Sequence, residues 1–280
     1  MTEILRYAAF TDNPAGGNPA GVVLDASGLD EATMRAIAAE VGYSETAFVT
    51  PQGNETFAVR FFSPESEVPF CGHATIATAV AYAERHQVDE LHFDTPAGRV
   101  DIHVTDSGDG PLATLTSVPP YVEDAADEDV AEALAALGWQ AAELDPGLPP
   151  RVAYAGARHL VLAAATRKRL AELDYDFARL RALMTARDWV SVALVFRRDQ
   201  TTFDARNPFP TGGVVEDPAT GAAAAAFGAY LRALRAIAPP ARLTIHQGHD
   251  LGRPSLLLVD VPAGAETRIQ VSGRAVPIQR

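Results

Sequence analysis

Hydrophobic and polar positions along the chain alternate between short strand-like runs and longer helix-like stretches. Two helix patterns consist mainly of small residues: CGHATIATAVAYAERH from Cys71, and DPATGAAAAAFGAYLRALRA from Asp217. Each leads into an apolar strand pattern, a turn and a Gly-Arg pair (98–99 and 252–253) that opens a further strand. These patterns predict a protein of mixed α and β structure.

The predicted elements form two sets, one on each side of a proline-rich and acidic segment at 117–129 that we interpret as a linker. Strands are predicted at 3–10, 20–25, 45–50, 56–62, 91–95 and 99–105, then at 152–156, 159–165, 190–197, 202–206, 242–247 and 255–261. Helices are predicted at 29–42, 71–86, 128–138, 167–184 and 218–236. The last strand pattern, TRIQVSGRAVPI, could pair with either set.

The two sets match each other in order. FAVRFFSPESEVPFCGHAT, from Phe57, aligns without a gap on FDARNPFPTGGVVEDPATG, from Phe203. The alignment pairs Arg60 with Arg206, Cys71 with Asp217, and Thr75 with Gly221. Four matched elements in one order favour an internal repeat. The alternative is chance recurrence of Phe, Arg, Pro and Gly in an α/β protein.

We therefore predict an α+β fold of two similar domains related by a pseudo-two-fold axis. The first covers 1–118, which a C-terminal strand at 266–280 could complete, and the second covers 119–265. Ligand sites favour the crevice between domains. A small carboxylate-bearing molecule is the expected occupant of that cleft.

The repeat predicts that Cys71 and Asp217 lie at equivalent helix starts. A helix N-terminus offers unpaired N–H groups and about half a positive charge, so two of them facing one cleft would hold an anion. Gly72 and Gly221 lack side chains that would keep a ligand from the backbone. The alternative for Asp217 is simple helix capping, with Pro218 at the first helical position.

Composition narrows the possible functions. The 280 residues carry a net charge of −13, which disfavours nucleic acid and anionic membrane as partners. The N-terminus lacks the basic and apolar regions of a signal peptide, and no apolar run reaches the roughly 18 residues of a membrane span. The histidines show no metal-ligand spacing, and no nucleotide-binding motif occurs. We expect a cytoplasmic protein without metal or cofactor.

The single cysteine raises the question of a Cys71 nucleophile with His73 as its base. Racemases built from two such halves use one cysteine from each half, and here Asp217 stands where the second thiol would be. A Cys-x-His pair at a helix start does not predict a nucleophile–base contact, because such partners are normally distant in sequence. We interpret Cys71 as packing or a remnant. His73 is expected to bind a carboxylate or relay a proton, or else to cap the helix.

Five stretches resemble the phenazine-biosynthesis PhzF-like isomerases. They are GNPAGVVLDA (17–26), YSETAFV (43–49), RFFSPESEVPFCGHATIATA (60–79), EDPATG (216–221) and QGHDLGRPS (247–255). They occur in the family's order and span nearly the whole chain. The resemblance implies a diaminopimelate epimerase-like fold, a homodimer, and cofactor-independent proton transfer on a small carboxylate.

The resemblance also implies the site. For catalysis it implies Glu45, from the family's Ser-Glu-Thr motif, with His73 and Asp217; for substrate binding, Asn18, Gly72, Gly221 and Ala222. In the best-studied branch a serine stands at the position of Ala222, so the dihydro-hydroxyanthranilate substrate of that branch is less secure than the fold.

From the residues alone, Glu45 follows VGYS and precedes TAFVT, a largely apolar run in which a charged carboxylate is disfavoured. A carboxyl group in such surroundings can both take and give a proton. The alternative is a strand glutamate that faces solvent. Two other functions stay open: a non-enzymatic module that binds a ligand or partner, and a cysteine hydrolase that uses Cys71.

Overall fold

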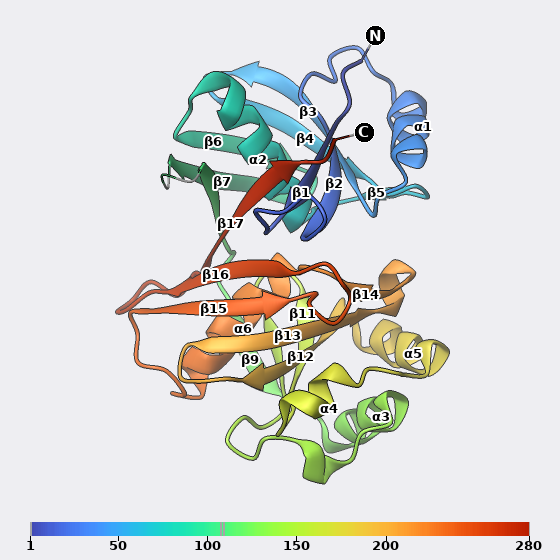
Figure 1. Cartoon of the computed structure of the whole chain (residues 1–280), viewed down its shortest axis with the longest axis vertical. Helices are drawn as coiled ribbons and strands as arrows, with labels where there is room; N and C mark the ends of the chain where they lie inside the picture. Colours follow the sequence, from blue (N-terminus) through green and yellow to red (C-terminus); the bar gives the residue numbers. More distant parts are fainter. Residues whose placement is uncertain (1, 107, 109, 280) are drawn as a thin grey trace. The chain divides into compact units, whose positions relative to one another are not determined.

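Strand pairing and packing group the chain into two units in a computed structural model that describes residues 2–106, 108 and 110–279 (Figure 1). The first unit comprises the residues up to Thr116 together with those from Ser272 onward. The second comprises Ser117–Val271. Among the described residues, no helix combines the length and the hydropathy that crossing a membrane requires.

The first unit is built from strands around one long helix. Its strands are β1 (Leu5–Ala9), β2 (Asn18–Val23), β3 (Thr46–Gly53), β4 (Thr56–Phe62), β5 (Glu67–Val68), β6 (Glu90–Thr95), β7 (Gly98–Asp106), β8 (Pro111–Thr116) and most of β17 (Gln270–Pro277). Its helices are α1 (Glu31–Val41) and α2 (Gly72–His86).

The second unit has more helices. Its strands are β9 (Tyr121–Asp124), β10 (Arg151–Tyr154), β11 (Arg158–Ala163), β12 (Ser191–Arg197), β13 (Thr202–Phe209), β14 (Val214–Asp217), β15 (Ala241–Gln247) and β16 (Ser255–Val261). Its helices are α3 (Asp127–Leu137), α4 (Arg167–Ala171), α5 (Phe177–Arg187) and α6 (Gly221–Ala233), with short 3₁₀ turns η1 (Ala141–Glu143) and η2 (Pro210–Gly212).

The same succession of strand pairings occurs in both units. β1 pairs antiparallel with β2, β2 parallel with β3, and β3 antiparallel with β4. β4 then pairs antiparallel with β5 and parallel with β6, which pairs antiparallel with β7. The strands β10 to β16 repeat these pairings one by one. Each parallel pair needs a crossover, and α2 and α6 supply two of them.

The C-terminal strand completes the first unit. β17 pairs antiparallel with β1 and also pairs with β8, so the paired strands close on themselves (Figure 1). The hydroxyls of Thr114 and Ser272 lie 2.8 Å apart across this junction. Closure removes the exposed edges that an open sheet would leave.

Helix α2 is buried because nearly all its residues are small or apolar. It packs against β1, β2, β3, β7 and β8, with Ile76 and Val80 fully buried. The two buried hydroxyls, of Thr75 and Thr78, donate to the helix carbonyls of Cys71 and Ala74 at 2.7 Å each. These two bonds satisfy the hydroxyl groups that α2 buries.

We predicted that the segment 117–129 is a linker, but it contains regular structure. It contains β9, which pairs antiparallel with β10 and places Tyr121 opposite Tyr154. It also contains the start of α3, whose first turn carries three acidic residues that favour a helix N-terminus. The composition was read correctly as polar and proline-rich, but the strand has too few apolar residues to be recognised from its pattern.

The single helix predicted at 167–184 is two helices. α4 ends at Ala171, and α5 starts after Asp176, whose side chain accepts a hydrogen bond from the Arg179 amide. Aspartate is a strong N-cap residue, so it starts a new helix rather than continuing the first. The predicted helices at 71–86 and 128–138 are confirmed within one residue.

The gapless repeat alignment is wrong by three positions beyond β4 and β13. Arg60 and Glu67, seven residues apart, form an ion pair with Nε–Oε1 at 2.7 Å. Arg206 and Glu216, ten residues apart, form the matching pair at 2.9 Å. The extra residues form η2. Gly221 therefore corresponds to Gly72, as the first residue of its helix, and not to Thr75.

Candidate functional site

The candidate site in the first unit gathers side chains from three segments. Glu45 lies just before β3 and its carbonyl accepts from the Gly21 amide of β2, at 3.1 Å. Cys71 is the N-cap residue of α2, and His73 is in the first turn of that helix. Asn18 is the first residue of β2. The parallel pairing of β2 with β3, and the packing of α2 on both strands, bring the four together.

The carboxylate of Glu45 contacts both a thiol and an imidazole. Its Oε2 lies 3.4 Å from His73 Nε2 and 3.5 Å from Cys71 Sγ. The exposed fraction of the side chain is 15% for Glu45 and 7% for His73. The alternative interpretation of Glu45 as a strand residue facing solvent is therefore wrong. A nearly buried carboxylate beside an imidazole is suited to proton transfer.

Asn18 determines which nitrogen of His73 carries the proton. The Asn18 side-chain nitrogen lies 3.1 Å from His73 Nδ1. An amide nitrogen can only donate, so Nδ1 accepts and the neutral ring holds its proton on Nε2. That nitrogen faces Glu45 and also the Ser44 hydroxyl, at 3.4 Å. Asn18 therefore orients the imidazole, and its role in substrate binding stays a prediction.

Cys71 lies in the site and is therefore more than core packing, whereas its interpretation as a remnant of a racemase stays a prediction. Its sulfur lies 3.4 Å from His73 Nδ1 and 3.8 Å from Nε2. We expected no contact between two side chains only two residues apart at a helix start. The contact forms because Cys71 is the extended N-cap residue, with φ −144° and ψ 114°, whereas His73 is already helical. Both side chains then point toward Glu45.

The prediction that Cys71 and Asp217 lie at equivalent helix starts is wrong, and so is the alternative that Asp217 caps α6. Asp217 is the last residue of β14, and Thr220 is the N-cap residue. The Asp217 carboxylate accepts from the Thr220 hydroxyl at 2.6 Å. Pro218 consequently lies before the helix and not at its first position. The turn between β14 and α6 delays the helix by three residues.

Gln247 is the first residue of the stretch QGHDLGRPS, and the sequence did not predict a role for it. Its side-chain nitrogen donates to the Asp217 carbonyl at 2.7 Å, and its oxygen accepts from the Thr220 amide at 3.1 Å. The next residue, Gly248, has φ +74°, and a Cβ there would lie 2.7 Å from the Pro218 carbonyl oxygen. Gln247 and Gly248 together hold the turn before α6 in place. This Gln-Gly pair is the feature of the sequence that could have pointed to the role of Gln247.

The predicted substrate-binding glycines both begin helices. Gly72 opens α2 and Gly221 opens α6, with Ala222 as the second residue of α6. A Cβ on Gly72 would meet only the Phe70 ring, at 4.0 Å, so packing does not require glycine there. The N-cap side chains of Cys71 and Thr220 make no capping bond to their helices. Both helix starts therefore suit an anion.

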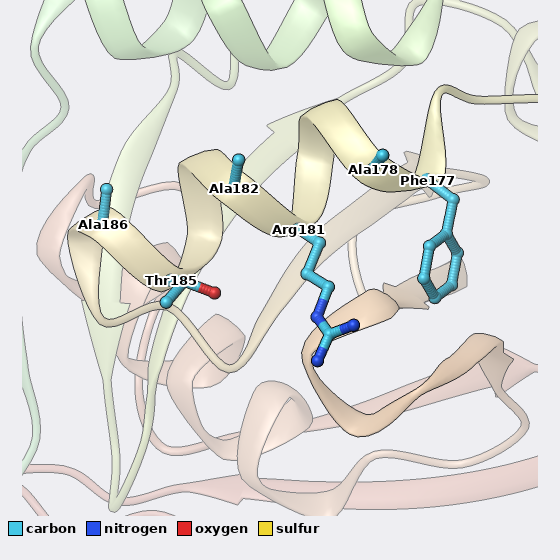
Figure 2. A pocket seen from close by; sticks show the side chains of 6 residues that line it. All are labelled: Phe177, Ala178, Arg181, Ala182, Thr185 and Ala186. Atoms are coloured by element: carbon cyan, nitrogen blue, oxygen red, sulfur yellow. The ribbon is translucent and has the colours of Figure 1, made fainter.

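Three of the site residues also form a potential metal-binding group. One ligand atom each from Glu45, Cys71 and His73 lie within 4.8 Å of one another. We predicted no metal site because the sequence has no regular ligand spacing. A pocket on the second unit lies along α5, where Phe177 and Arg181 are among its lining residues (Figure 2). None of the predicted site residues lines it.

Solved structures define the class of protein. The chain superposes on a PhzF-family protein from Bacillus anthracis with a TM-score of 0.88, at 26% identity over 99% of this chain and 98% of the other. A hydroxyproline epimerase from Agrobacterium vitis shares the fold, with a TM-score of 0.65 at 14% identity, covering 98% of this chain and 88% of the other. The predicted diaminopimelate epimerase-like fold is confirmed.

The chain belongs to the phenazine biosynthesis-like protein family, whose model matches residues 7–280. It is 36% identical to an uncharacterized isomerase from Deinococcus radiodurans, over 93% of this chain and 87% of the relative. It is 32% identical to the trans-2,3-dihydro-3-hydroxyanthranilate isomerase of Pseudomonas fluorescens, over 97% of this chain and 95% of the relative. The predictions of the family and of an isomerase are confirmed.

Proposed function

We propose that the chain is a cofactor-independent isomerase that moves a proton on a small carboxylate-bearing metabolite, with Glu45 as the acid/base. One observation carries the proposal: the Glu45 carboxylate is nearly buried and contacts His73 Nε2 at 3.4 Å. A carboxyl group in such a place can take a proton from an activated carbon and return it to another position.

The neighbours of Glu45 have distinct roles in this proposal. His73, oriented by Asn18, directs its Nε2–H to Glu45 and stabilises the carboxylate while it is charged. The N–H groups in the first turn of α2 bind the substrate carboxylate, and the absence of a Cβ on Gly72 lets it approach. The helix dipole adds to this attraction.

Asp217 assists by holding the first turn of α6 in place through Thr220. In this proposal the N–H groups at Gly221 and Ala222 are a further anion-binding set within the second unit. Ala222 has a methyl group where a serine would have a hydroxymethyl group, so one hydrogen-bonding hydroxyl is missing from substrate recognition. A homodimer is part of the proposal and rests on the family resemblance.

The test is proton exchange with solvent. Trans-2,3-dihydro-3-hydroxyanthranilate, the substrate in the name of the Pseudomonas relative, is the first probe, followed by other small carboxylates with an activated C–H bond. We expect solvent deuterium to enter the substrate during turnover, as followed by NMR. Glu45→Gln should slow this exchange by about 10²–10⁴-fold. Exchange at the wild-type rate in Glu45→Gln would show that another group moves the proton.

A second candidate function is a cysteine hydrolase, which the contact of Cys71 Sγ with His73 at 3.4 Å supports. Alkylation of Cys71 does not separate the two candidates, because a bulky adduct beside Glu45 blocks either reaction. Cys71→Ala does separate them. A hydrolase loses its nucleophile, whereas the isomerase keeps Glu45 and His73 and stays active.

A further inference from the structure

We propose that Glu45, Cys71 and His73 form a binding site for one divalent transition-metal ion of the zinc type, and that the bound ion switches the isomerase off. The loss of activity rests on the proposed role of Glu45 as the acid/base. The binding of the ion does not depend on that role, because it follows from the donor atoms and their positions.

The pairwise separations of the three donor atoms are close to those around a tetrahedral zinc ion. Zinc bonds of about 2.3 Å to sulfur and about 2.0–2.2 Å to nitrogen and oxygen give donor separations of about 3.5 Å for S–N, 3.5 Å for S–O and 3.3 Å for N–O. The observed separations are 3.8 Å for Cys71 Sγ to His73 Nε2, 3.5 Å for Sγ to Glu45 Oε2, and 3.4 Å for Nε2 to Oε2. Sγ also lies 3.4 Å from Nδ1, beside the ring, so a rotation of the Cys71 side chain toward Nε2 is needed to complete the triangle.

The donor types select the metal. A thiolate, an imidazole and a carboxylate together favour Zn²⁺ and Co²⁺ over the hard ions Mg²⁺ and Ca²⁺, which prefer oxygen ligands. Three protein ligands leave a fourth position for water, as in zinc sites that are open to solvent. All three residues are buried or nearly so, which protects the bonds from exchange.

The structure also supplies an outer partner for the imidazole. A metal on Nε2 of His73 places the ring proton on Nδ1, which then needs an acceptor. Asn18 lies 3.1 Å from Nδ1 and is 2% exposed. A half-turn of its amide exchanges the nitrogen for the oxygen and provides that acceptor. Asn18 thus serves the free ring with one atom and the metal-bound ring with the other.

Metal binding and proton transfer exclude each other. The Cys71 thiol releases its proton to the buffer, and its sulfur electron pair bonds to the ion. Glu45 Oε2 donates an electron pair to the same ion and is then no longer available to accept a substrate proton. Removing the ion with a chelator returns both groups to their free state.

Cobalt titration tests the site directly, because a cobalt–thiolate bond absorbs in the near ultraviolet. The chain has one cysteine, so such a band can arise only from Cys71. We expect one Co²⁺ per chain, displaced by Zn²⁺. Glu45→Gln and His73→Gln should each weaken binding by at least about 10-fold, and Asn18→Ala by about 10–100-fold. Cys71→Ser should lose the band.

The matched control is a histidine–carboxylate pair that lacks a thiol. His92 Nδ1 lies 2.8 Å from Asp101 on the surface, so His92→Gln removes a possible adventitious ligand and should leave the cobalt band unchanged. Circular dichroism and thermal unfolding establish that each variant is folded. No band at saturating cobalt, or a band of unchanged affinity in both Glu45→Gln and His73→Gln, overturns the proposal.

The outcomes for metal and for catalysis are separable. If cobalt binds as expected but Glu45→Gln exchanges protons at the wild-type rate, the metal site stands and the acid/base role falls. If Glu45→Gln abolishes exchange but no cobalt band forms, the acid/base role stands and the metal site falls. If both stand, Zn²⁺ should abolish exchange, and a chelator should restore it.

Discussion

The starts of α2 and α6 share a backbone plan but differ in chemistry. Each helix begins with a glycine, after a strand joined to its neighbour by an Arg–Glu pair. At α2 the surrounding donors come from three separate segments, and the carboxylate of Glu45 sits 3.4–3.5 Å from its neighbours. At α6 the carboxylate of Asp217 is bound by the Thr220 hydroxyl at 2.6 Å.

The two carboxylates therefore differ in how tightly their neighbours hold them. In our proposal, the short bond to a hydroxyl in the same turn gives Asp217 a structural role. The looser contacts of Glu45, with a titratable imidazole and a thiol, leave it able to exchange a proton. The two Arg–Glu pairs differ in the same sense, since Arg206 and Glu216 are buried whereas Arg60 is 36% exposed.

The largest expected effect separates the two carboxylates. Glu45→Gln should lower the exchange rate by about 10²–10⁴-fold, because glutamine cannot cycle a proton. Asp217→Asn should lower it far less, because its amide oxygen still accepts from Thr220. Rates measured on one substrate by deuterium incorporation check both. Equal losses in the two variants would remove the distinction between a reactive and a structural carboxylate.

Gly248→Ala should destabilise the turn before α6. Its positive φ disfavours alanine, and the new methyl group would collide with the carbonyl oxygens of Pro218 and Arg253. We expect a loss of about 2–4 kcal/mol in the free energy of unfolding.

The matched control for Gly248→Ala is Gly252→Ala, which has φ +77° but no atom within 4 Å of the added Cβ. It should lose only about 1 kcal/mol, from backbone strain. Urea unfolding compares the two, and similar losses would show that the contact with Pro218 is unimportant.

A buried histidine in the second unit makes the stability of the fold depend on pH. His159 of β11 is completely buried, and desolvation lowers its pKa from 6.5 to about 3. Its Nδ1 lies 2.9 Å from the Ser191 hydroxyl, which donates to Asn207. The unfolded chain therefore binds a proton between about pH 6.5 and 3 that the folded chain rejects. Stability rises with pH through this window and is lost as the pH falls.

We expect His159 to account for a loss of about 2 kcal/mol in the free energy of unfolding between pH 7.5 and 5. His159→Gln removes the titration and should flatten this part of the pH profile, as measured by urea unfolding at each pH. His103→Gln, an exposed histidine, should leave the slope unchanged. An unaltered slope in His159→Gln would assign the acid sensitivity to other groups.

The smallest effects concern the two N-cap residues. Thr220→Val removes the hydroxyl that bonds Asp217 and Gln247 and should lower the free energy of unfolding by about 1–2 kcal/mol.

Cys71→Ser places a good capping residue at the start of α2 and should raise the free energy of unfolding by up to about 1 kcal/mol. Thermal unfolding measures both. A loss in Cys71→Ser would mean that burial of the sulfur outweighs capping.

Local patterns were sufficient for most elements, whereas the candidate site residues came from the family resemblance and their roles stay predictions. The small-residue runs predicted α2 and α6, and the resemblance identified Glu45, His73 and Asp217. Where the prediction failed, a local signal competed with the pattern: Asp176 restarts a helix, and η2 shifts the repeat by three residues. The strand β9 escaped because its pairing with β10 outweighs a composition typical of a loop.

The family, the alternation of strands and helices, and the residue types available for chemistry could all be read from the sequence. The contact of Cys71 with Glu45, 26 residues away, and that of Asn18 with His73, 55 residues away, could be seen only in the folded chain. The reason is the short range, along the chain, of the forces that shape helices and strands. Helix and strand preferences act over a few neighbouring residues, whereas these contacts depend on the parallel pairing of β2 with β3 and on the packing of α2 against them.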